Sequence, residues 1–201
     1  MHAGEFWIGL DFVHQVTQSE PHLLQIDLLD IDDNYVSMVY DGFLIGGKDD
    51  GYRFYVSISS KFLKGIRKDL LLSSNPHWNI TELASIVLRH NRTKFITSDH
   101  INPSQTSSLT SKQQLFYREC STWFRSGWWY VSPTRSSIYD KAPLLDSCRH
   151  LNLFQLMAPL ESSHDHLSVK WNNWYHDDGD GDGHTPRQLR YIMMKIRPDN
   201  R

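Results

Sequence analysis

The stretch Cys120-Ser-Thr-Trp-Phe-Arg-Ser-Gly-Trp-Trp-Tyr130 decides the fold of this chain. It gathers large aromatic side chains around Gly127 and begins with one of only two cysteines in 201 residues. Adjacent tryptophans carry so much apolar area that they cannot all face water without cost. Gly127 lets the backbone pass close to another segment or adopt a positive φ. The residues alone therefore predict a packed core around Trp128, Trp129 and Tyr130.

The composition is that of one globular domain without a strong charge bias. Hydrophobic residues make up 39% of the chain, charged residues make up 22%, and the formal net charge is −2. A chain of this length can bury one substantial core. The near-neutral charge argues against nucleic acid or an anionic membrane as the main partner. No apolar run approaches the roughly 20 residues of a membrane span, and the first residues lack the pattern of a signal peptide.

The first third of the chain predicts a short helix followed by an antiparallel meander. The spacing of apolar residues indicates a helix from about Asp11. Three β-compatible stretches follow at 23–29, 35–45 and 52–58, separated by turn residues, and Gly42 is a predicted bulge or turn. Strands in this order favour an antiparallel sheet over βαβ units.

Two later segments are predicted from local pattern. Residues 80–88 have helical spacing, so we expect a helix there. Residues 104–114 are rich in Ser, Thr and Gln, which is typical of a mobile loop.

Six motifs resemble the fibrinogen C-terminal domain family and occur in that family's order. One of them is the Gly-Trp-Trp-Tyr segment at 127–130. The others are Gly4-Glu-Phe-Trp-Ile-Gly-Leu10 with His14-Gln-Val-Thr17, Leu24-Gln-Ile-Asp-Leu28, His90-Asn91 with Lys94-Phe-Ile-Thr-Ser-Asp99, Val169-Lys-Trp-Asn-Asn-Trp174, and Met194-Lys-Ile-Arg-Pro198. The resemblance implies an α+β fibrinogen C-terminal-like globe. Its central twisted sheet is mostly antiparallel, with short helices and a loop-rich C-terminal ligand subdomain.

The resemblance implies a single domain over residues 1–201. Residues 1–98 and 169–198 would form the central sheet subdomain, and residues 99–168 the loop-rich pocket subdomain. We expect insertions relative to the family near 65–88, 104–114, 131–147 and 177–185. We expect the structural core to include Trp7, Trp128, Trp129, Tyr130, Trp171 and Trp174.

The family normally has a small subdomain before the Gly-Glu-Phe-Trp motif, and this sequence starts at that motif. We therefore expect a divergent member that lacks the subdomain, a fragment of a longer protein, or an alternative product (isoform) of one. A missing subdomain would leave apolar surface exposed near Phe6, Trp7 and Phe12.

The resemblance also implies a disulfide between Cys120 and Cys148. The family places the second cysteine three residues after Gly-Trp-Trp-Tyr, where this chain has Pro133. Cys148 is followed by Asn152-Leu153, which matches the family's pattern after that cysteine. The alternative is two buried free thiols. Sequons at Asn79 and Asn91 add two candidate glycosylation sites.

The ligand-pocket candidates are Trp123, Phe124, Arg149 and His150. Fibrinogen holds a peptide's amino end through acidic and amide groups, and the matching positions here are Trp123 and Phe124. Lectin-like relatives line their pocket with a histidine directly after the second cysteine, where this chain has Arg149. The residues of this chain therefore predict neither the peptide-binding chemistry of fibrinogen nor the sugar-binding chemistry of the lectin-like relatives. An aromatic patch with Arg149 at its edge favours a protein partner.

We expect no cofactor. In the family's calcium loop, which would follow Asp99, Ile101 and Pro103 replace two expected carboxylates. A second acidic run (Asp178, Asp180 and Asp182) matches half of an EF-hand loop, but its twelfth position is Leu189. A zinc cluster of His164, His166, His176 and His184 is a weaker alternative.

The sequence thus predicts a non-catalytic, secreted recognition domain that binds a cell-surface or matrix protein in signalling or adhesion. A ficolin-like lectin for acetylated sugars is the alternative. A metal-dependent hydrolase is a third candidate, and no Gly-x-Ser-x-Gly elbow supports a serine triad.

Overall fold

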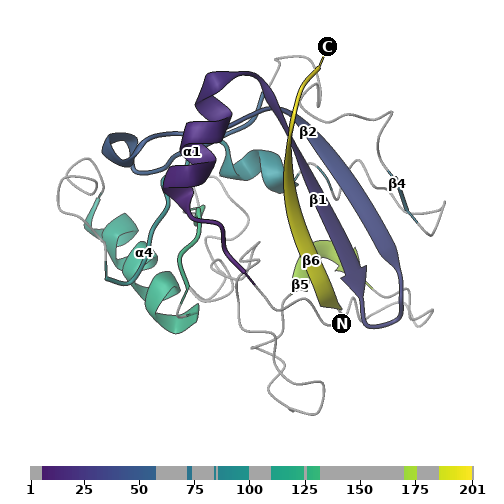
Figure 1. Cartoon of the computed structure of the whole chain (residues 1–201). Coiled ribbons are helices and arrows are strands. Elements are labelled where there is room, and N and C mark those ends of the chain that lie inside the picture. The colour runs from purple at the N-terminus through teal and green to yellow at the C-terminus, as the bar shows by residue number, and fades with distance from the viewer. Residues whose placement is uncertain are drawn as a thin grey trace.

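The computed structural model describes residues 6–57, 72–73, 84, 86–99, 110–124, 126–131, 170–175 and 186–200. The described part holds two α-helices, two 3₁₀ helices and six strands (Figure 1). The helical elements are α1 (Leu10–Ser19), η1 (Lys48–Asp50), η3 (Ile86–His90) and α4 (Ser111–Phe124). The strands are β1 (His22–Asp30), β2 (Tyr35–Ile45), β3 (Phe54–Tyr55), β4 (Leu72–Ser73), β5 (Lys170–Tyr175) and β6 (Pro186–Pro198).

The strands form one sheet in the order β3-β2-β1-β6-β5, and β4 also pairs with β2. Every pairing between the described strands is antiparallel. The last strand, β6, pairs with the first, β1, along nearly its whole length. The centre of the sheet therefore joins residues from opposite ends of the chain, and the α+β fold class is confirmed.

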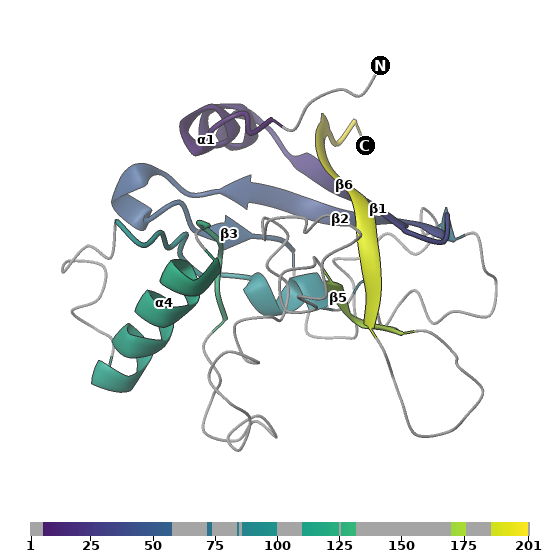
Figure 2. The same ribbon diagram turned by 90° about the horizontal axis from the view of Figure 1, so that it is seen from below.

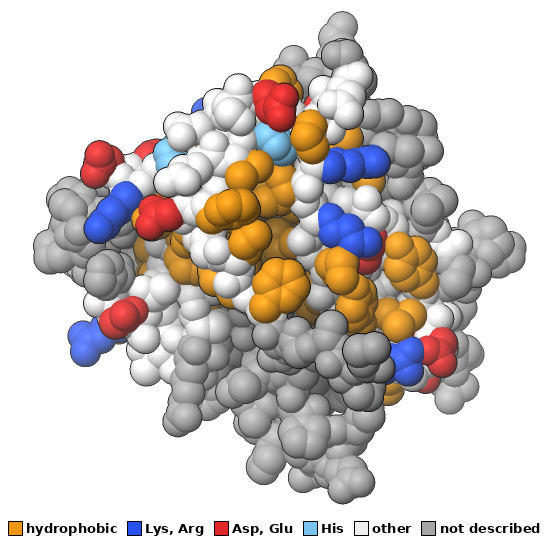
Figure 3. Space-filling model, viewed as in Figure 1, with side chains coloured by type: hydrophobic (Ala, Val, Ile, Leu, Met, Phe, Trp, Pro, Cys, Tyr) orange, Lys and Arg blue, Asp and Glu red, His pale blue; other side chains and the backbone are white. Residues whose placement is uncertain are grey.

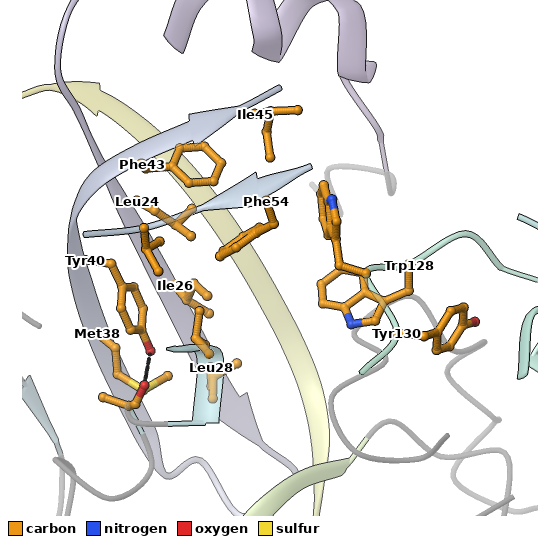
Figure 4. Close-up of a cluster of buried hydrophobic side chains, with 14 of the residues drawn as sticks. Leu24, Ile26, Leu28, Met38, Tyr40, Phe43, Ile45, Phe54, Trp128 and Tyr130 are labelled. Atoms are coloured by element: carbon orange, nitrogen blue, oxygen red, sulfur yellow. Dashed lines mark hydrogen bonds between the residues drawn. The ribbon is translucent and has the colours of Figure 1, made fainter. Parts of the chain in front are cut away.

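Helices lie on both sides of this sheet. Figure 2 shows α1 on one side, and α4 with η3 on the other. The strand face toward α4 and η3 carries the core, in which Leu24, Ile26 and Leu28 of β1 are fully buried (Figure 4). Beside them, the Tyr40 hydroxyl donates to the Ala84 carbonyl at 3.0 Å. Burial raises the pKa of Tyr40 well above its ordinary value, so this hydroxyl stays protonated as a donor.

Three predictions in the first third of the chain are confirmed. The helix spans Leu10–Ser19, and the first two strands cover the predicted ranges. The bulge at Gly42 is also present, because His22 pairs with Phe43 while Leu24 pairs with Tyr40. Gly42 has a φ of 59°, and a Cβ there would lie 2.1 Å from the Ser57 hydroxyl oxygen. Only glycine fits this position without a shift.

The predicted strand at 52–58 is wrong in length. Only Phe54 and Tyr55 form β3 in the described part of the chain. Gly51 and Tyr52 have positive φ values that interrupt an extended chain. On the other edge of β3, Phe54 bonds to the turn at 91–93 and not to another strand: its N–H donates to the Thr93 carbonyl. Alternation of side chains predicted the exposure pattern here but not these backbone partners.

The predicted loop at 104–114 is wrong at its end, because α4 begins at Ser111. Thr110 and Gln113 form a reciprocal cap. The Thr110 N–H donates to the Gln113 side-chain oxygen at 3.0 Å, and the Gln113 N–H donates to the Thr110 hydroxyl at 3.3 Å. A Thr-x-x-Gln capping box is readable in sequence. Of the predicted helix at 80–88, the structure describes helical backbone at Ala84 and the 3₁₀ helix Ile86–His90.

Candidate functional site

The Gly-Trp-Trp-Tyr segment at 127–130 is a buried framework. Trp128 and Ile96 exchange backbone hydrogen bonds of 2.9 and 3.0 Å, which pins the segment beside residues 95–97. A Cβ on Gly127 would lie 2.5 Å from the Phe95 ring. The close approach predicted for Gly127 is therefore present.

Trp129 joins this segment to β3. Its indole N–H donates to the Tyr52 carbonyl at 2.7 Å. Its ring makes edge contacts with Phe54 and Phe95, at centroid distances of 5.3 and 4.9 Å. Trp128 and Tyr130 are buried as well, so the core prediction for these three rings holds.

His90 closes the framework from η3. Its Nδ1 lies 2.6 Å from the Trp129 carbonyl oxygen, and because a carbonyl can only accept, Nδ1 carries the proton. The His90 ring packs edge-on against Trp128 at 5.9 Å, and its Nε2 has no hydrogen-bond partner among the residues that the structure describes. Burial lowers the pKa of His90 to about 4, against the smaller opposing effect of the Trp129 bond. The ring is therefore neutral at physiological pH.

Helix α4 leads from the capping box to the predicted pocket. Phe116 and Cys120, four residues apart, are buried on one side of the helix, and Leu115 is exposed on another. The sulfur of Cys120 is bonded in a disulfide. Its predicted partner Cys148 lies outside the described residues.

The predicted pocket lining is not described. Trp123 and Phe124 form the last turn of α4, and the described part includes their backbone but not their side chains. Arg149 and His150 lie outside the described residues. The structure thus places the helix that would carry two of the four pocket candidates.

The sequon Asn91-Arg92-Thr93 lies directly after η3, in a tight turn against β3. The Asn91 side-chain oxygen accepts from the Val56 N–H at 3.1 Å. The Thr93 hydroxyl donates to the His90 carbonyl at 2.6 Å. The other sequon, at Asn79, lies outside the described residues.

The metal candidates stay predictions. Asp99 ends a described segment and is exposed. Asp178, Asp180, Asp182 and the four zinc candidates His164, His166, His176 and His184 lie outside the described residues. Within the described ranges, no group of three or more His, Cys, Asp or Glu side chains is close enough to hold a metal ion.

Trp7 is not a core residue, which corrects the prediction. Its side chain is 46% exposed, and one face stacks on Phe95 with ring centroids 6.4 Å apart. Phe6, Ile8 and Phe12 are 83%, 52% and 52% exposed. The exposure expected near Phe6, Trp7 and Phe12 is therefore present. Trp171 and Trp174 lie in β5, and their side chains are not described.

The sheet face on the side of α1 carries a charged network that the sequence analysis missed. Asp27 is only 2% exposed, and it accepts from Lys195 at 2.6 Å, Ser37 at 2.6 Å and Gln25 at 2.9 Å. Burial alone would raise the pKa of Asp27, but these hydrogen bonds outweigh it and hold the pKa below its ordinary value. Alternation along β1, with Gln25 and Asp27 opposite Leu24 and Ile26, could have revealed this polar face.

Figure 3 shows the molecule from that side, where Lys and Arg side chains lie among hydrophobic ones. Arg190 forms a further ion pair with Asp33 at the end of the sheet. The described charges of β6 are thus partly neutralised within the fold.

A comparison with known families agrees with this framework. A family model described as "Fibrinogen beta and gamma chains, C-terminal globular domain" matches residues 1–199. The chain belongs to this family.

Curated relatives of this fibrinogen C-terminal domain include fibrinogen-like protein 1 from Bos taurus, which is 25% identical. That match covers 98% of this chain and 50% of the relative. Angiopoietin-2 from Canis lupus familiaris is also 25% identical, with 98% of this chain and 29% of that protein covered. The chain therefore spans half or less of the length of these relatives.

A solved structure shows the same fold. The fibrinogen-like globe domain of human ANGPTL6 matches with a TM-score of 0.50 and 21% identity, covering 97% of this chain and 64% of that one. In the part of this chain that the structure describes, no helix is long and apolar enough to cross a membrane.

Proposed function

We propose that this domain is a non-catalytic, extracellular recognition domain that binds a cell-surface or matrix protein in signalling or adhesion. The family match over residues 1–199 is the observation that carries the proposal. The angiopoietins and fibrinogen-like protein 1 among the relatives support a secreted signalling role.

The packing of the Gly-Trp-Trp-Tyr segment favours a binding surface made by neighbouring side chains and not by the segment itself. Trp128, Trp129 and Tyr130 are buried in the framework, so they have no surface to offer a partner. Binding would then fall to the side chains at the end of α4, Trp123 and Phe124, together with Arg149 and His150. Aromatic and arginine side chains are enriched at the centres of protein interfaces.

A Cys120–Cys148 disulfide would hold these two groups together. We propose this pairing because Cys120 is disulfide-bonded and the chain has only one other cysteine. We further propose that the domain uses no calcium or other cofactor, and that Asn79 and Asn91 carry glycans. The whole chain would act as a single domain.

Binding of the secreted, tagged chain to intact animal cells tests this function. We expect saturable binding that is lost after mild protease treatment of the cells and is unchanged by N-acetylglucosamine or EDTA. Competition by the acetylated sugar would instead assign a lectin. The absence of binding to any cell type or matrix preparation would contradict a recognition role.

A further inference from the structure

In the folded domain, the sequon at Asn91 is held by intramolecular hydrogen bonds of its side chains and its backbone. Both side chains that define an acceptor sequon are engaged: the Asn91 carboxamide oxygen accepts from Val56, and the Thr93 hydroxyl donates to His90. The backbone is engaged too, because the N–H groups of Asn91, Arg92 and Thr93 donate to the carbonyls of Leu88, Phe54 and His90. Arg92 has a φ of 66°, so the three residues form a tight turn and not an extended segment.

Some of the contacts that hold this turn involve residues further along the chain, which the ribosome adds after the sequon. His90 is fixed by the Trp129 carbonyl, which lies 39 residues further along the chain. Phe95, two residues after the sequon, packs on Trp129. The sheet beneath needs β6, because β1 pairs with Pro186–Pro198 at the far end of the chain. Long-range contacts of this kind cannot form until synthesis has passed them.

We propose that folding sets a time limit on the glycosylation of Asn91: the sequon accepts a glycan while the chain is open and rejects it once the turn has closed. This inference rests on the proposed extracellular location, since only a chain entering the secretory pathway meets the transferase. An enzyme that selects Asn-x-Ser/Thr must contact both the carboxamide and the hydroxyl. In the folded domain both groups already have intramolecular partners.

The transfer itself balances with one named co-reactant, a lipid-linked oligosaccharide diphosphate. The Asn91 amide nitrogen attacks the anomeric carbon of the first sugar and forms the new C–N bond. The anomeric C–O bond breaks, the lipid diphosphate leaves with the electron pair, and the amide proton passes to solvent or an enzyme base.

The fold can retain a glycan added in this way. The glycan would be attached through the Asn91 nitrogen, whereas the contact with Val56 uses the carboxamide oxygen. Asn91 is only partly buried, as a residue that carries a linked sugar must be.

The test offers the full chain to purified oligosaccharyltransferase with the lipid-linked oligosaccharide. Unglycosylated chain is made in bacteria and compared in two forms. One is folded, and the other is reduced, capped at its thiols and diluted from urea at the moment of mixing, so that it is still open when it meets the transferase. We expect at least tenfold higher occupancy of the Asn91 peptide in the open form. The Asn91→Gln variant, which keeps a carboxamide but is no acceptor, gives the background.

Equal occupancy in the two forms would overturn the proposal, and so would no transfer to the open form. A free peptide of residues 86–98 serves as the positive control for the acceptor sequence. Because the test is done in vitro, its result does not depend on whether the protein is secreted. A failure of the proposed function is therefore distinguishable from a failure of this inference.

Discussion

At the scale of single residues, the framework depends on positions where the fold leaves no room or no solvent. Gly127 allows the segment at 127–130 to lie against Phe95 and Thr97. His90, the last residue of η3, is buried against Trp128 and Trp129. His90 is buried, and Gly127 has no side chain that could contact a partner. The roles of these two residues are therefore best measured by the change in the free energy of unfolding when they are substituted.

Gly127→Ala should destabilise the domain by about 1–3 kcal/mol, because an added Cβ would force Phe95 and Thr97 away from the segment. Urea unfolding followed by tryptophan fluorescence measures the loss. An unchanged midpoint would show that the neighbours yield freely and that the close approach is not required.

Acid should weaken the fold through His90. Its folded pKa of about 4 lies below the ordinary value of 6.5, so the unfolded chain takes up a proton that the folded chain refuses. The stability that depends on a neutral His90 is fully present above pH 6.5 and decreases as the pH falls from 6.5 to 4. Below pH 4 the free energy of unfolding is lower by about 3 kcal/mol. Urea unfolding at several pH values between 7.5 and 4.5 follows this loss.

His90→Asn is the matched variant, because its amide can replace the Nδ1–H donor without titrating. It should unfold more easily at pH 7.5 but lose less stability between pH 7 and 5 than the native chain. Equal pH slopes in the two proteins would contradict the assignment of the acid effect to His90.

At the scale of elements, α4 links the buried framework to the surface proposed for binding. Its capping box fixes where the helix begins, Phe116 and Cys120 anchor it, and Trp123 and Phe124 end it. The disulfide at Cys120 therefore restricts the position of the proposed pocket and also stabilises the fold.

Cys120→Ser should cost a few kcal/mol, since a bridge to Cys148 would restrict the unfolded chain over a loop of about 29 residues. Thermal unfolding of the native and variant proteins measures this cost. A non-reducing peptide map of the native protein should contain the Cys120–Cys148 cross-link. An unaltered melting temperature together with two free thiols would contradict the pairing.

At the scale of the whole molecule, the sheet joins the first and last described strands around one core. Outside the described residues, Ile101 and Pro103 stand where the family's calcium loop has two carboxylates. Calcium should therefore change the melting temperature very little. A calcium titration followed by thermal unfolding checks this expectation. An upward shift of several degrees would show that Asp99 or the acidic run at 178–182 binds the ion.

Much of this architecture could be predicted from sequence, for physical reasons that differ between elements. Helix α1 and strand β2 follow from side-chain periodicity, and Gly42 from its freedom of φ. The short β3 could not be predicted, because its end is set by bonds to residues 91–93 that periodicity does not encode. Trp7 drew two opposite expectations: burial, because large rings in a family motif are usually in the core, and exposure, because the subdomain that precedes this motif in the family is not seen here. Its 46% exposure agrees with the second.

Binding through the end of α4 is tested by comparing the cell-surface binding of pocket variants with that of a matched control. Phe124→Ala and Arg149→Ala should each weaken binding at least tenfold and leave the melting temperature nearly unchanged. Leu115→Ala, an exposed position on the same helix, should bind like the native chain. Native affinity in both pocket variants would contradict recognition through the end of α4.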